Sequence, residues 1–304
     1  MTYRTIAFID KCSITIPVPQ EHWAVAEYHL SDLPYRNENC SVARVATYGS
    51  RPQLYLTSWT YRPRSADAKD KFYIQALPLI PGIAFMRIEW NPRKIREDGF
   101  RELIGLLSTC IPYFLLALAH STITRADITF DVYTGIDRFF VLTHSAATSS
   151  NPWFQNEGRL NAYYLGSSKA PHKLLVYDKN FEQFQGNKVV STMGKLRLLR
   201  SRTRCELRIS RLGKIQDIPS APNPFRRYIF ADRSKAADYA GGSNWRRFQE
   251  RSIRSTAQEA MRHYTTQGER SMYRRALKRC APDWYNADEI WAEARAALSN
   301  IFSG

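Results

Sequence analysis

Short segments in which polar and apolar residues alternate fill the first two thirds of this 304-residue chain. Alternation with a period of two places successive side chains on opposite faces, as in the half-buried strands of an antiparallel sheet. A largely antiparallel sheet is therefore the predicted body of the protein. The predicted strands are Thr5–Ile16, Gln53–Tyr61, Lys71–Leu79, Ile83–Trp90, Ile123–Tyr133, Leu160–Leu165, Lys173–Asp178 and Thr203–Ser210.

Helical patterns interrupt the strands and then replace them in the last third of the chain. The predicted helices are Gln20–Leu30, Gly99–Ala119, Asp137–Ser145, Asn244–Gln267, Gly268–Cys280 and Ala287–Phe302. Strands followed by a helical tail indicate an α+β fold. Segments rich in Pro and Gly, 217–225 and 240–243, mark a boundary. We predict a sheet-rich body over 1–216, a linker over 217–243 and a basic helical region over 244–304.

A faint internal repeat suggests that the body consists of two similar α/β units. The first half contains QLYLTSW, KFYIQAL and FMRIEWNPRKI, and the second contains NAYYLGSS, HKLLVYDK and RCELRISRLGKI. Short strand patterns of this kind also recur by chance, so duplication and coincidence both stay open. Two similar units that face each other would place a site between them.

One uncharged stretch is long enough to be compared with a membrane-spanning helix. Leu103–Ala119 has 17 residues without a charge, the lower limit for crossing a bilayer, and Pro112 interrupts it. Charged residues and strand patterns resume on both sides, so we predict a buried helix that kinks or breaks at Pro112. A signal peptide is not expected either, because Asp10 and strand-like alternation interrupt the apolar run that export requires.

Several catalytic and metal-binding motifs are missing from the sequence. The five cysteines are scattered, without a Cys-x-x-Cys pair or a His at metal-finger spacing, as is typical of reduced thiols in a cytoplasmic protein. The Gly-x-x-x-x-Gly-Lys-Ser/Thr phosphate loop and the Gly-x-Ser-x-Gly elbow are also absent. We therefore expect no intrinsic ATPase or helicase and no serine hydrolase.

Positive charge is concentrated in one stretch of the chain. The formal charge is +16, from 44 Lys and Arg against 28 Asp and Glu. Lys195–Arg279 holds 22 basic and 7 acidic residues, or +15, and the remainder holds 22 and 21, or +1. Arg outnumbers Lys there by 18 to 4 and is interleaved with aromatic residues, which suits phosphate contacts and base stacking. Nucleic acid is the predicted partner, with a solvated surface or a membrane-facing patch as alternatives.

Three predicted strands carry acids flanked by arginine on one face. Asp127 and Asp131 share a face of TRADITFDVY but lie about 13 Å apart along the strand, too far to chelate one ion together. Glu206 in TRCELRIS and Glu89 in FMRIEWNP are placed in the same way. Either a carboxylate from a neighbouring strand completes a metal site, or these acids form ion pairs across a solvent-facing sheet.

The segment NAYYLGSSKAPHKLLVYDKN combines a turn suited to phosphate with a tyrosine. The Gly166–Lys169 turn offers backbone N–H groups, hydroxyls and an ammonium. The next strand delivers Tyr177 and Lys179 on one face and Asp178 on the other, unless the strand ends there. A tyrosine hydroxyl has a pKa of about 10, so its attack on a phosphodiester needs a cation and a proton acceptor. His172 is a candidate acceptor.

The order of these motifs resembles the replication initiation factor family of plasmids and filamentous phages, whose members start rolling-circle replication. RIEWNPRKI, ITRADITFDV, YYLGSSK…KLLVYDK and TRCELRIS carry the resemblance, from Ile83 to about Ile215. It implies a metal-dependent endonuclease and strand transferase that binds origin DNA and nicks one strand through a tyrosine. That reaction leaves a 5′-phosphotyrosine link and a free 3′-hydroxyl, and the enzyme later rejoins the strand.

The resemblance also assigns roles to particular side chains. Tyr177 would be the nucleophile, with Lys179 as a second catalytic residue. The divalent metal would be held by carboxylates, namely Asp127, Asp178, Glu206 and Asp131, with Glu89 as a further candidate. No two of the six histidines have the His-x-His spacing that other rolling-circle nickases use, and oxygen ligands favour Mg²⁺ or Mn²⁺. The expected DNA contacts are Lys169, Arg204, Arg208, Arg246, Arg247, Arg251 and Arg254.

Other residues and other functions stay open at this point. Tyr163 and Tyr164 are alternative nucleophiles or stacking platforms, and packing is the simplest role for both. The alternative function is a non-catalytic DNA-binding replication initiator or repressor that recognises repeated origin sites through a helix within 243–280. A third is an RNA-binding protein that stacks bases on its sheet. For the initiator, the expected partners are origin duplex or hairpin, single-stranded DNA, host helicase and polymerase, and a second copy in a homodimer, without a membrane.

Overall fold

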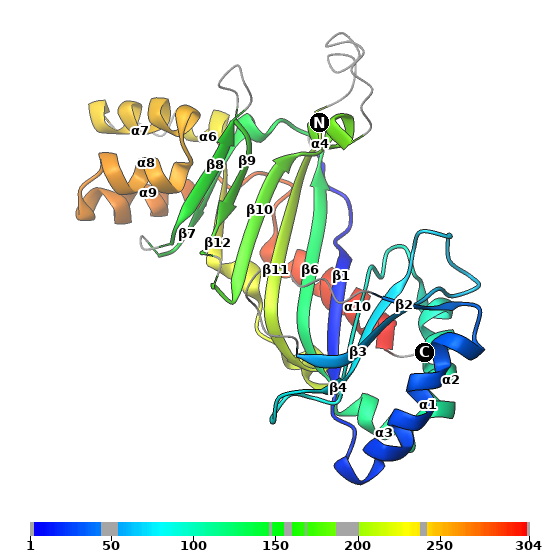
Figure 1. Cartoon of the computed structure of the whole chain (residues 1–304). Helices are drawn as coiled ribbons and strands as arrows, with labels where there is room; N and C mark the ends of the chain where they lie inside the picture. Colours follow the sequence, from blue (N-terminus) through cyan, green and yellow to red (C-terminus); the bar gives the residue numbers. More distant parts are fainter. Residues whose placement is uncertain are drawn as a thin grey trace. The chain divides into compact units, whose positions relative to one another are not determined.

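A computed structural model of the chain describes residues 3–43, 54–145, 148–154, 160–167, 169–186, 201–237 and 242–302. Both strands and helices are abundant, and a large antiparallel sheet is accompanied by a helical C-terminal region (Figure 1). The predicted α+β class is therefore confirmed.

In the described part of the chain, ten strands form one sheet in the order β2-β3-β4-β5-β1-β6-β11-β10-β9-β8. The strands are β1 (Phe8–Ile16), β2 (Cys40–Val42), β3 (Tyr55–Tyr61), β4 (Phe72–Pro78), β5 (Met86–Trp90), β6 (Thr122–Val132), β8 (Ser150–Phe154), β9 (Leu160–Leu165), β10 (His172–Asp178) and β11 (Thr203–Lys214). Every predicted strand is present, with its ends shifted by four residues or fewer. The alternation of polar and apolar residues therefore located the sheet correctly.

The sheet contains one strand order twice. In the first half, β2, β3, β4 and β5 lie side by side in chain order, and β5 also neighbours β1, which precedes them in the sequence. The order β8-β9-β10-β11-β6 repeats this arrangement, so β4 and β10 occupy corresponding places. This correspondence supports the expectation of two similar units.

The chain divides into two compact units, each assembled from separate segments. Unit 1 comprises Met1–Ala7, Thr129–Arg208 and Asn223–Glu293, and unit 2 comprises Phe8–Ile128, Ile209–Pro222 and Ala294–Gly304. The division of labour predicted for 1–216, 217–243 and 244–304 stays a prediction.

Unit 2 packs aromatic side chains between its strands and helices. Its helical segments are η1 (Gln20–His22), α1 (Trp23–Arg36), α2 (Glu97–Cys110), α3 (Phe114–Ala119) and η3 (Ile215–Ser220). The rings of Trp90 on β5 and Phe100 on α2 are stacked and buried, with centroids 5.1 Å apart. The interruption between α2 and α3 contains Pro112, which confirms the predicted break. Among the helices in the described ranges, none has the length and apolarity needed to cross a membrane.

Unit 1 gathers its C-terminal helices into a separate core beside β7 and β12 (Figure 1). Its helical segments are η2 (Ile136–Arg138), α4 (Lys179–Gly186), η4 (Pro224–Arg227), α6 (Arg233–Ala237), α7 (Gly242–Arg254), α8 (Ala257–Tyr264) and α9 (Gln267–Arg279), and α10 (Ala287–Phe302) begins in this unit. Thr256 and Thr266 accept N–H hydrogen bonds as N-caps of α8 and α9. Thr256 therefore divides the predicted helix Asn244–Gln267 in two, and Thr266 separates it from the helix that follows. Trp245 and Phe248 of α7 belong to the buried cluster.

A second, two-stranded antiparallel sheet pairs β7 (Phe139–Thr143) with β12 (Tyr228–Asp232). The prediction of a helix over Asp137–Ser145 is therefore wrong. All five side chains of FFVLT are buried, and an uninterrupted apolar run shows neither helical nor strand periodicity. β12 escaped prediction because it lies between Pro-rich and Gly-rich segments, within the stretch assigned to a linker.

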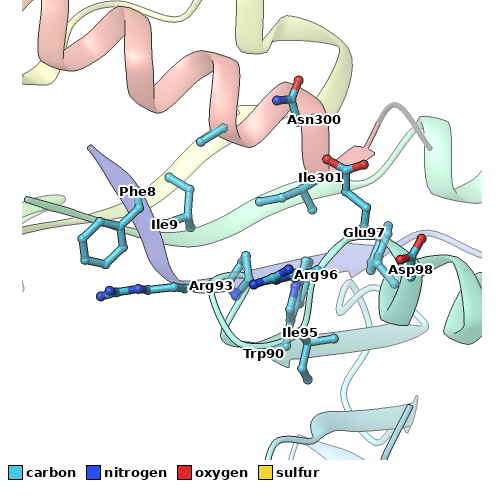
Figure 2. A pocket seen from close by; sticks show the side chains of 13 residues that line it. Phe8, Ile9, Trp90, Arg93, Ile95, Arg96, Glu97, Asp98, Asn300 and Ile301 are labelled. Atoms are coloured by element: carbon cyan, nitrogen blue, oxygen red, sulfur yellow. The ribbon is translucent and has the colours of Figure 1, made fainter. Parts of the chain in front are cut away.

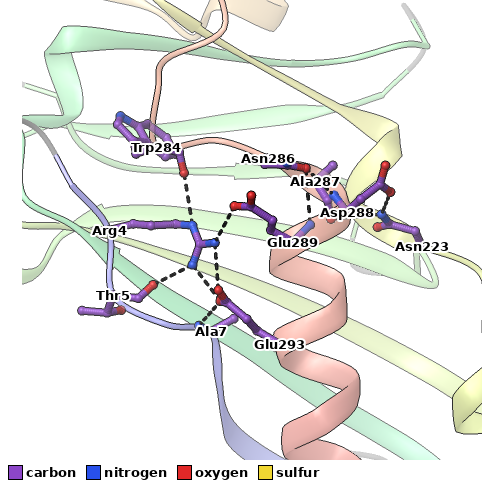
Figure 3. A network of polar contacts seen from close by, with 10 residues as sticks. All are labelled: Arg4, Thr5, Ala7, Asn223, Trp284, Asn286, Ala287, Asp288, Glu289 and Glu293. Carbon is purple, nitrogen blue, oxygen red and sulfur yellow. Dashed lines mark hydrogen bonds and ion pairs between the residues drawn. The ribbon is translucent and has the colours of Figure 1, made fainter.

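The first residues of unit 1 are fastened to α10 and to the loop before it (Figure 3). Arg4 donates to the main-chain oxygen of Trp284 at 3.1 Å and forms an ion pair with Glu293 at 2.7 Å. Glu293 also accepts the backbone N–H of Ala7 at 2.8 Å. These contacts explain why the segment before β1 belongs to unit 1.

Candidate active site around Tyr177

Tyr177 lies on the solvent-facing side of the β9–β10 hairpin in unit 1. Leu174 and Val176, whose side chains point to the other face of β10, are fully buried, whereas Tyr177 is half-buried. This is the alternation expected of HKLLVYD in a strand with one covered face. The residue paired with Tyr177 on β9 is Ala162, which presents only a methyl group.

An arginine held by a buried carboxylate touches the Tyr177 hydroxyl. Arg204 of β11 donates to the two carboxylate oxygens of Asp131 on β6, from Nε at 2.6 Å and from Nη2 at 3.0 Å. The two side chains are 7% and 6% exposed, so this bidentate pair fixes the guanidinium. Arg204 also donates a hydrogen bond to the phenol oxygen of Tyr177. The roles predicted for Asp131 as a metal ligand and for Arg204 as a DNA contact stay predictions.

Other charges around Tyr177 favour its protonated form. Burial raises the pKa of the Tyr177 hydroxyl well above its ordinary value; Arg204 opposes this rise, and Glu206 and Glu182 add to it. The ammonium of Lys179 lies 5.6 Å from the Tyr177 ring centroid and forms an ion pair with Glu182 at 2.7 Å. Tyr177 is therefore a neutral phenol at neutral pH and must lose its proton as it attacks a phosphate.

Asp178 ends β10 and caps the helix α4 that follows. Its Oδ1 accepts the backbone N–H groups of Asn180 at 3.0 Å and Phe181 at 3.1 Å. This arrangement satisfies two donors that the first turn of α4 would otherwise leave without partners. The strand ends at Asp178, as a role for this carboxylate on the face of Tyr177 would require. Metal binding by Asp178 stays a prediction.

Other carboxylates predicted to hold a metal lie beside arginine. Asp127, in unit 2, forms an ion pair with Arg125 at 2.5 Å, and Glu206, in unit 1, lies 3.7 Å from Arg208. Both pairs join residues two positions apart on one strand, and Asp127 is buried, so they differ from the ion pairs across a solvent-facing sheet that the sequence left open. Within the residues that the structure describes, no three His, Cys, Asp or Glu side chains gather into a group suited to a metal. These donors do not fit a ready-made metal site, and Mg²⁺ or Mn²⁺ stays a prediction.

The Gly166–Lys169 turn lies at the opposite end of the β9–β10 hairpin from Tyr177. His172 begins β10, and about 17 Å of extended strand separates it from Tyr177. His172 is therefore too distant to accept the Tyr177 proton directly. Ser168 lies outside the described residues, and Lys169 is exposed. A phosphate bound at this turn would be remote from the phenol.

A cavity of about 680 Å³ in unit 1 adjoins this turn. Its lining includes Arg227, which donates to Nδ1 of His172 at 2.7 Å. Since guanidinium is always a donor, His172 must be neutral, with its proton on Nε2. Burial lowers the pKa of His172, and the charge of Arg227 lowers it further. The cavity therefore contains a neutral histidine, and neither Tyr177 nor Arg204 is among its lining residues.

The arginines of α7 lie on its exposed side, away from the buried cluster. Trp245, Phe248 and Ser252 form the buried side of this helix at spacings of three and four residues. The exposed arginines are Arg246, Arg247, Arg251 and Arg254. Residues 242–280 hold ten Lys and Arg against three Asp and Glu, or +7. The α7–α9 segment therefore presents a basic surface of the kind that binds nucleic acid.

Two neighbouring tyrosines are less suited to attack a phosphate than Tyr177. Tyr163 is 4% exposed, and burial raises the pKa of its hydroxyl well above the ordinary value. Tyr164 shares the face of Tyr177, but the Lys173 ammonium lies 4.4 Å from the centroid of its ring. These positions favour packing for Tyr163 and leave Tyr177 as the better candidate.

Trp153 on β8 is a candidate functional residue that the sequence analysis missed. It is 63% exposed and paired with Ala162, on the same face as Tyr177. β8 is the last strand in the sheet order, where Pro152 is tolerated because an edge strand needs no donor on its free side. That proline obscured the strand, and the aromatic pair after it was the available signal.

Unit 2 contains a pocket of its own, with a volume of about 390 Å³ (Figure 2). The Arg93 guanidinium lies 4.4 Å from the Phe8 ring centroid beside this pocket. Glu97 and Asp98, at the start of α2, also line this pocket and lie 3.7 and 3.4 Å from the guanidinium of Arg101. None of the site residues predicted from the sequence appears among the described residues that line the pocket.

Comparisons with known proteins give a distant similarity to solved structures. No protein-family model matches the chain, and neither does any curated protein. A solved structure of a rolling circle replication initiator protein from Geobacillus stearothermophilus aligns with 84% of this chain and 98% of its own, with 11% identity and a TM-score of 0.42. Similarity at this level does not establish the fold or the function of this chain.

Proposed function

We propose that this protein nicks and rejoins one DNA strand at a replication origin, with Tyr177 as the nucleophile. The observation that carries the proposal is the Arg204 guanidinium, which two hydrogen bonds to Asp131 fix in place and whose charge acts on the Tyr177 hydroxyl. A phenol on an open sheet face, next to an immobilised cation, is suited to covalent chemistry at a phosphate. The order of the sequence motifs, which resembles that of rolling-circle initiators, agrees with this use.

The reaction would be an in-line transfer at one phosphodiester. The Tyr177 oxygen attacks the phosphorus and gives up its proton, and the bond between phosphorus and the 3′-oxygen breaks. The departing oxygen takes up a proton and becomes the free 3′-hydroxyl, while the 5′-phosphate stays on Tyr177. In rejoining, a 3′-hydroxyl attacks the phosphotyrosine and the phenol leaves. Glu206, whose charge already acts on Tyr177, is a candidate acceptor for the phenol proton.

The basic groups near Tyr177 would stabilise negative charge during this transfer. The hydrogen bond from Arg204 becomes stronger as the phenol turns into a phenolate or a leaving group. Lys179, beside the same ring, would neutralise charge on the phosphoryl oxygens. Mg²⁺ or Mn²⁺ remains an expectation from the sequence, and the described carboxylates form no ready-made site for it.

The α7–α9 segment would hold the origin DNA while the sheet acts on one strand. The exposed arginines of α7 can contact phosphates on the duplex. Binding through phosphates releases counterions, so affinity should fall steeply as the salt concentration rises. This arrangement gives the concentrated positive charge a function distinct from the chemistry at Tyr177.

A covalent-adduct assay tests the proposal. The full chain is incubated with Mg²⁺ and a supercoiled plasmid that carries the DNA flanking its own gene. We expect nicked circles with protein attached to the 5′ end, and neither product with Tyr177→Phe. Tyr164→Phe, which alters a hydroxyl on the same sheet face, serves as the matched control and should nick normally. Nicking and linkage by Tyr177→Phe at the wild-type level would exclude Tyr177 as the nucleophile.

A non-catalytic DNA-binding initiator or repressor is the second candidate function. The ion pairing of Asp127 and Asp131 with arginine favours it, because paired carboxylates are less available to a metal. This candidate predicts salt-sensitive binding of the same plasmid through the α7–α9 segment and no protein-linked DNA under any metal condition. The adduct assay therefore separates the two candidates.

A further inference from the structure

We infer that Trp153, Ala162 and Tyr177 form a slot that holds an unpaired base of single-stranded DNA. The inference rests on the proposed function, because it identifies the substrate of the Tyr177 site as an unpaired strand rather than a duplex. Trp153 would be the stacking platform, Ala162 the floor of the slot, and Tyr177 the group that faces the phosphate next to the held base.

The slot follows from the register of three neighbouring strands. Trp153 of β8 pairs with Ala162 of β9, and Ala162 pairs with Tyr177 of β10. Directly paired residues project from the same face of a sheet. Because strands are spaced about 4.8 Å apart, Trp153 and Tyr177 begin about 10 Å from each other, with only a methyl group between them.

The exposure of Trp153 is unusual within this protein. Its side chain is 63% exposed, whereas the other six tryptophans are buried or half-buried. An indole ring that faces water at the edge of a sheet adds little to the core. Its flat surface can stack on a base of any sequence, since every base has an aromatic face.

The neighbouring side chains restrict where a base can stack. Tyr164 is on the same face, but Lys173 already lies over its ring at 4.4 Å. Residues on the opposite face, such as Tyr163 and Val176, are buried in unit 1. The open position on this face therefore lies between Trp153 and Tyr177, above Ala162. A paired base within a duplex would be unable to enter it, because its ring faces are covered by the adjacent base pairs.

Binding of a short single strand tests the slot without any chemistry. The full chain with Tyr177→Phe, which cannot form the covalent link, is titrated with a fluorescently labelled oligothymidylate. Adding Trp153→Ala should weaken binding roughly 5- to 150-fold, and Trp153→Phe should restore most of the affinity. Ala162→Leu, which fills the slot but keeps the indole, should weaken binding as well. Tyr35→Ala removes an aromatic side chain that is 79% exposed in unit 2 and should leave the affinity unchanged.

Tryptophan fluorescence supplies an independent readout. Stacking of a base on Trp153 should quench part of the emission, and this quenching should disappear in Trp153→Phe. Thermal unfolding of each variant shows that the fold is retained. If Trp153→Ala and Ala162→Leu bind the oligonucleotide as tightly as their parent, the slot is refuted, whatever Tyr177→Phe does in the adduct assay. Equal or tighter binding of the matching RNA would refute the assignment to DNA. Binding that depends on Trp153, in a protein that never links DNA, supports the slot and refutes the nicking proposal.

Discussion

The two halves of the sheet place a tyrosine at corresponding strands and surround it differently. β4 and β10 hold the same place in the two strand orders. Tyr73 of β4 pairs with Glu89 of β5, whereas Tyr177 of β10 accepts a hydrogen bond from Arg204. At Tyr177, burial raises the pKa of the hydroxyl, the charge of Arg204 opposes this rise, and Glu206 and Glu182 add to it. Similar strand order therefore gives two different chemical environments, and the arginine beside Tyr177 is the feature that the proposed nicking reaction would use.

The ion pairs next to these tyrosines also differ in depth. Arg87 and Glu89 lie 2.8 Å apart with side chains 35% and 19% exposed, while Arg204 and Asp131 are 7% and 6% exposed. An exposed pair exchanges readily with water and contributes little to stability. A buried pair fixes its members, because separating them leaves a charge without a partner. Arg87 also donates to Ser13 and Gln75, so the two guanidinium groups differ in how deeply their ion pairs are buried rather than in whether they have partners.

The largest expected effect is the loss of DNA linkage in Tyr177→Phe but not in Tyr73→Phe. Without the hydroxyl no phosphotyrosine can form, and the loss of a nucleophile costs on the order of 10⁴-fold or more in rate. Tyr73→Phe removes a tyrosine hydroxyl from the corresponding strand of unit 2 and should nick normally. The measurement is the yield of protein-linked, nicked plasmid over time. Equal losses in the two variants would mean that the two halves act alike and that the comparison is mistaken.

The next effect concerns stability, and it contrasts the buried ion pair with the exposed one. Arg204→Met leaves the Asp131 carboxylate buried without its partner, which should lower the free energy of unfolding by about 3–5 kcal/mol. Arg87→Met should lower it by about 1 kcal/mol or less. Urea unfolding of both variants gives the two values.

A double variant distinguishes the contribution of the ion pair to stability from the cost of burying a single unpaired charge. Arg204→Met combined with Asp131→Leu removes both charges and should recover most of the lost stability. If Arg204→Met alone unfolds as easily as Arg87→Met, the guanidinium is not held as firmly as the contacts with Asp131 imply, and the contrast between the two halves weakens.

A smaller effect on stability concerns α4, the helix that directly follows β10. α4 begins directly after Asp178, whereas β4 continues to Pro78 and leads to β5. Asp178→Ala removes the acceptor of two backbone N–H groups and should cost about 1 kcal/mol in urea unfolding. Asp178→Asn caps a helix equally well and should be nearly neutral. If Asp178→Asn abolishes Mg²⁺-dependent nicking while keeping stability, the carboxylate is a metal ligand as well as a cap.

Much of the sheet could be predicted because one face of most strands is covered. Alternation identified β6, β10 and β11 and assigned the side chains of Tyr177 and Lys179 to one face. The pattern failed where that condition did not hold. FFVLT in β7 is buried throughout, and β8 contains a proline that reads as a turn. A period of two arises when one face of a strand is buried and the other is exposed, so it gives no signal where both faces are buried or both are exposed.

The contacts of the site could be predicted only in part. The alternation of side chains along each strand assigned Asp131 to a face of β6 and Arg204 to a face of β11. The two residues are 73 positions apart, however, and alternation does not indicate which strands are neighbours in the sheet. Proximity in sequence also misled the placement of phosphate at Gly166–Lys169, because a strand of seven residues carries the chain away from the turn before it reaches Tyr177. Strand order, which long-range packing determines, was the missing information.

The smallest effect concerns protons at the start of the two corresponding strands. β4 begins with Phe72, which does not titrate, and β10 begins with His172. Burial, and then Arg227, lower the pKa of His172 from its usual 6.5. At a pH below 6.5 but above the lowered pKa, the unfolded chain therefore binds a proton that the folded protein does not. The free energy of unfolding should therefore decrease as the pH is lowered through this window, and His172→Gln should make that decrease less steep.

His144 should cause the remaining decrease, because burial, Lys278 and Arg274 lower its pKa as well. Urea unfolding between about pH 7 and pH 5 measures both slopes, and equal slopes in wild type and His172→Gln would show that the Arg227 contact does not hold His172 neutral.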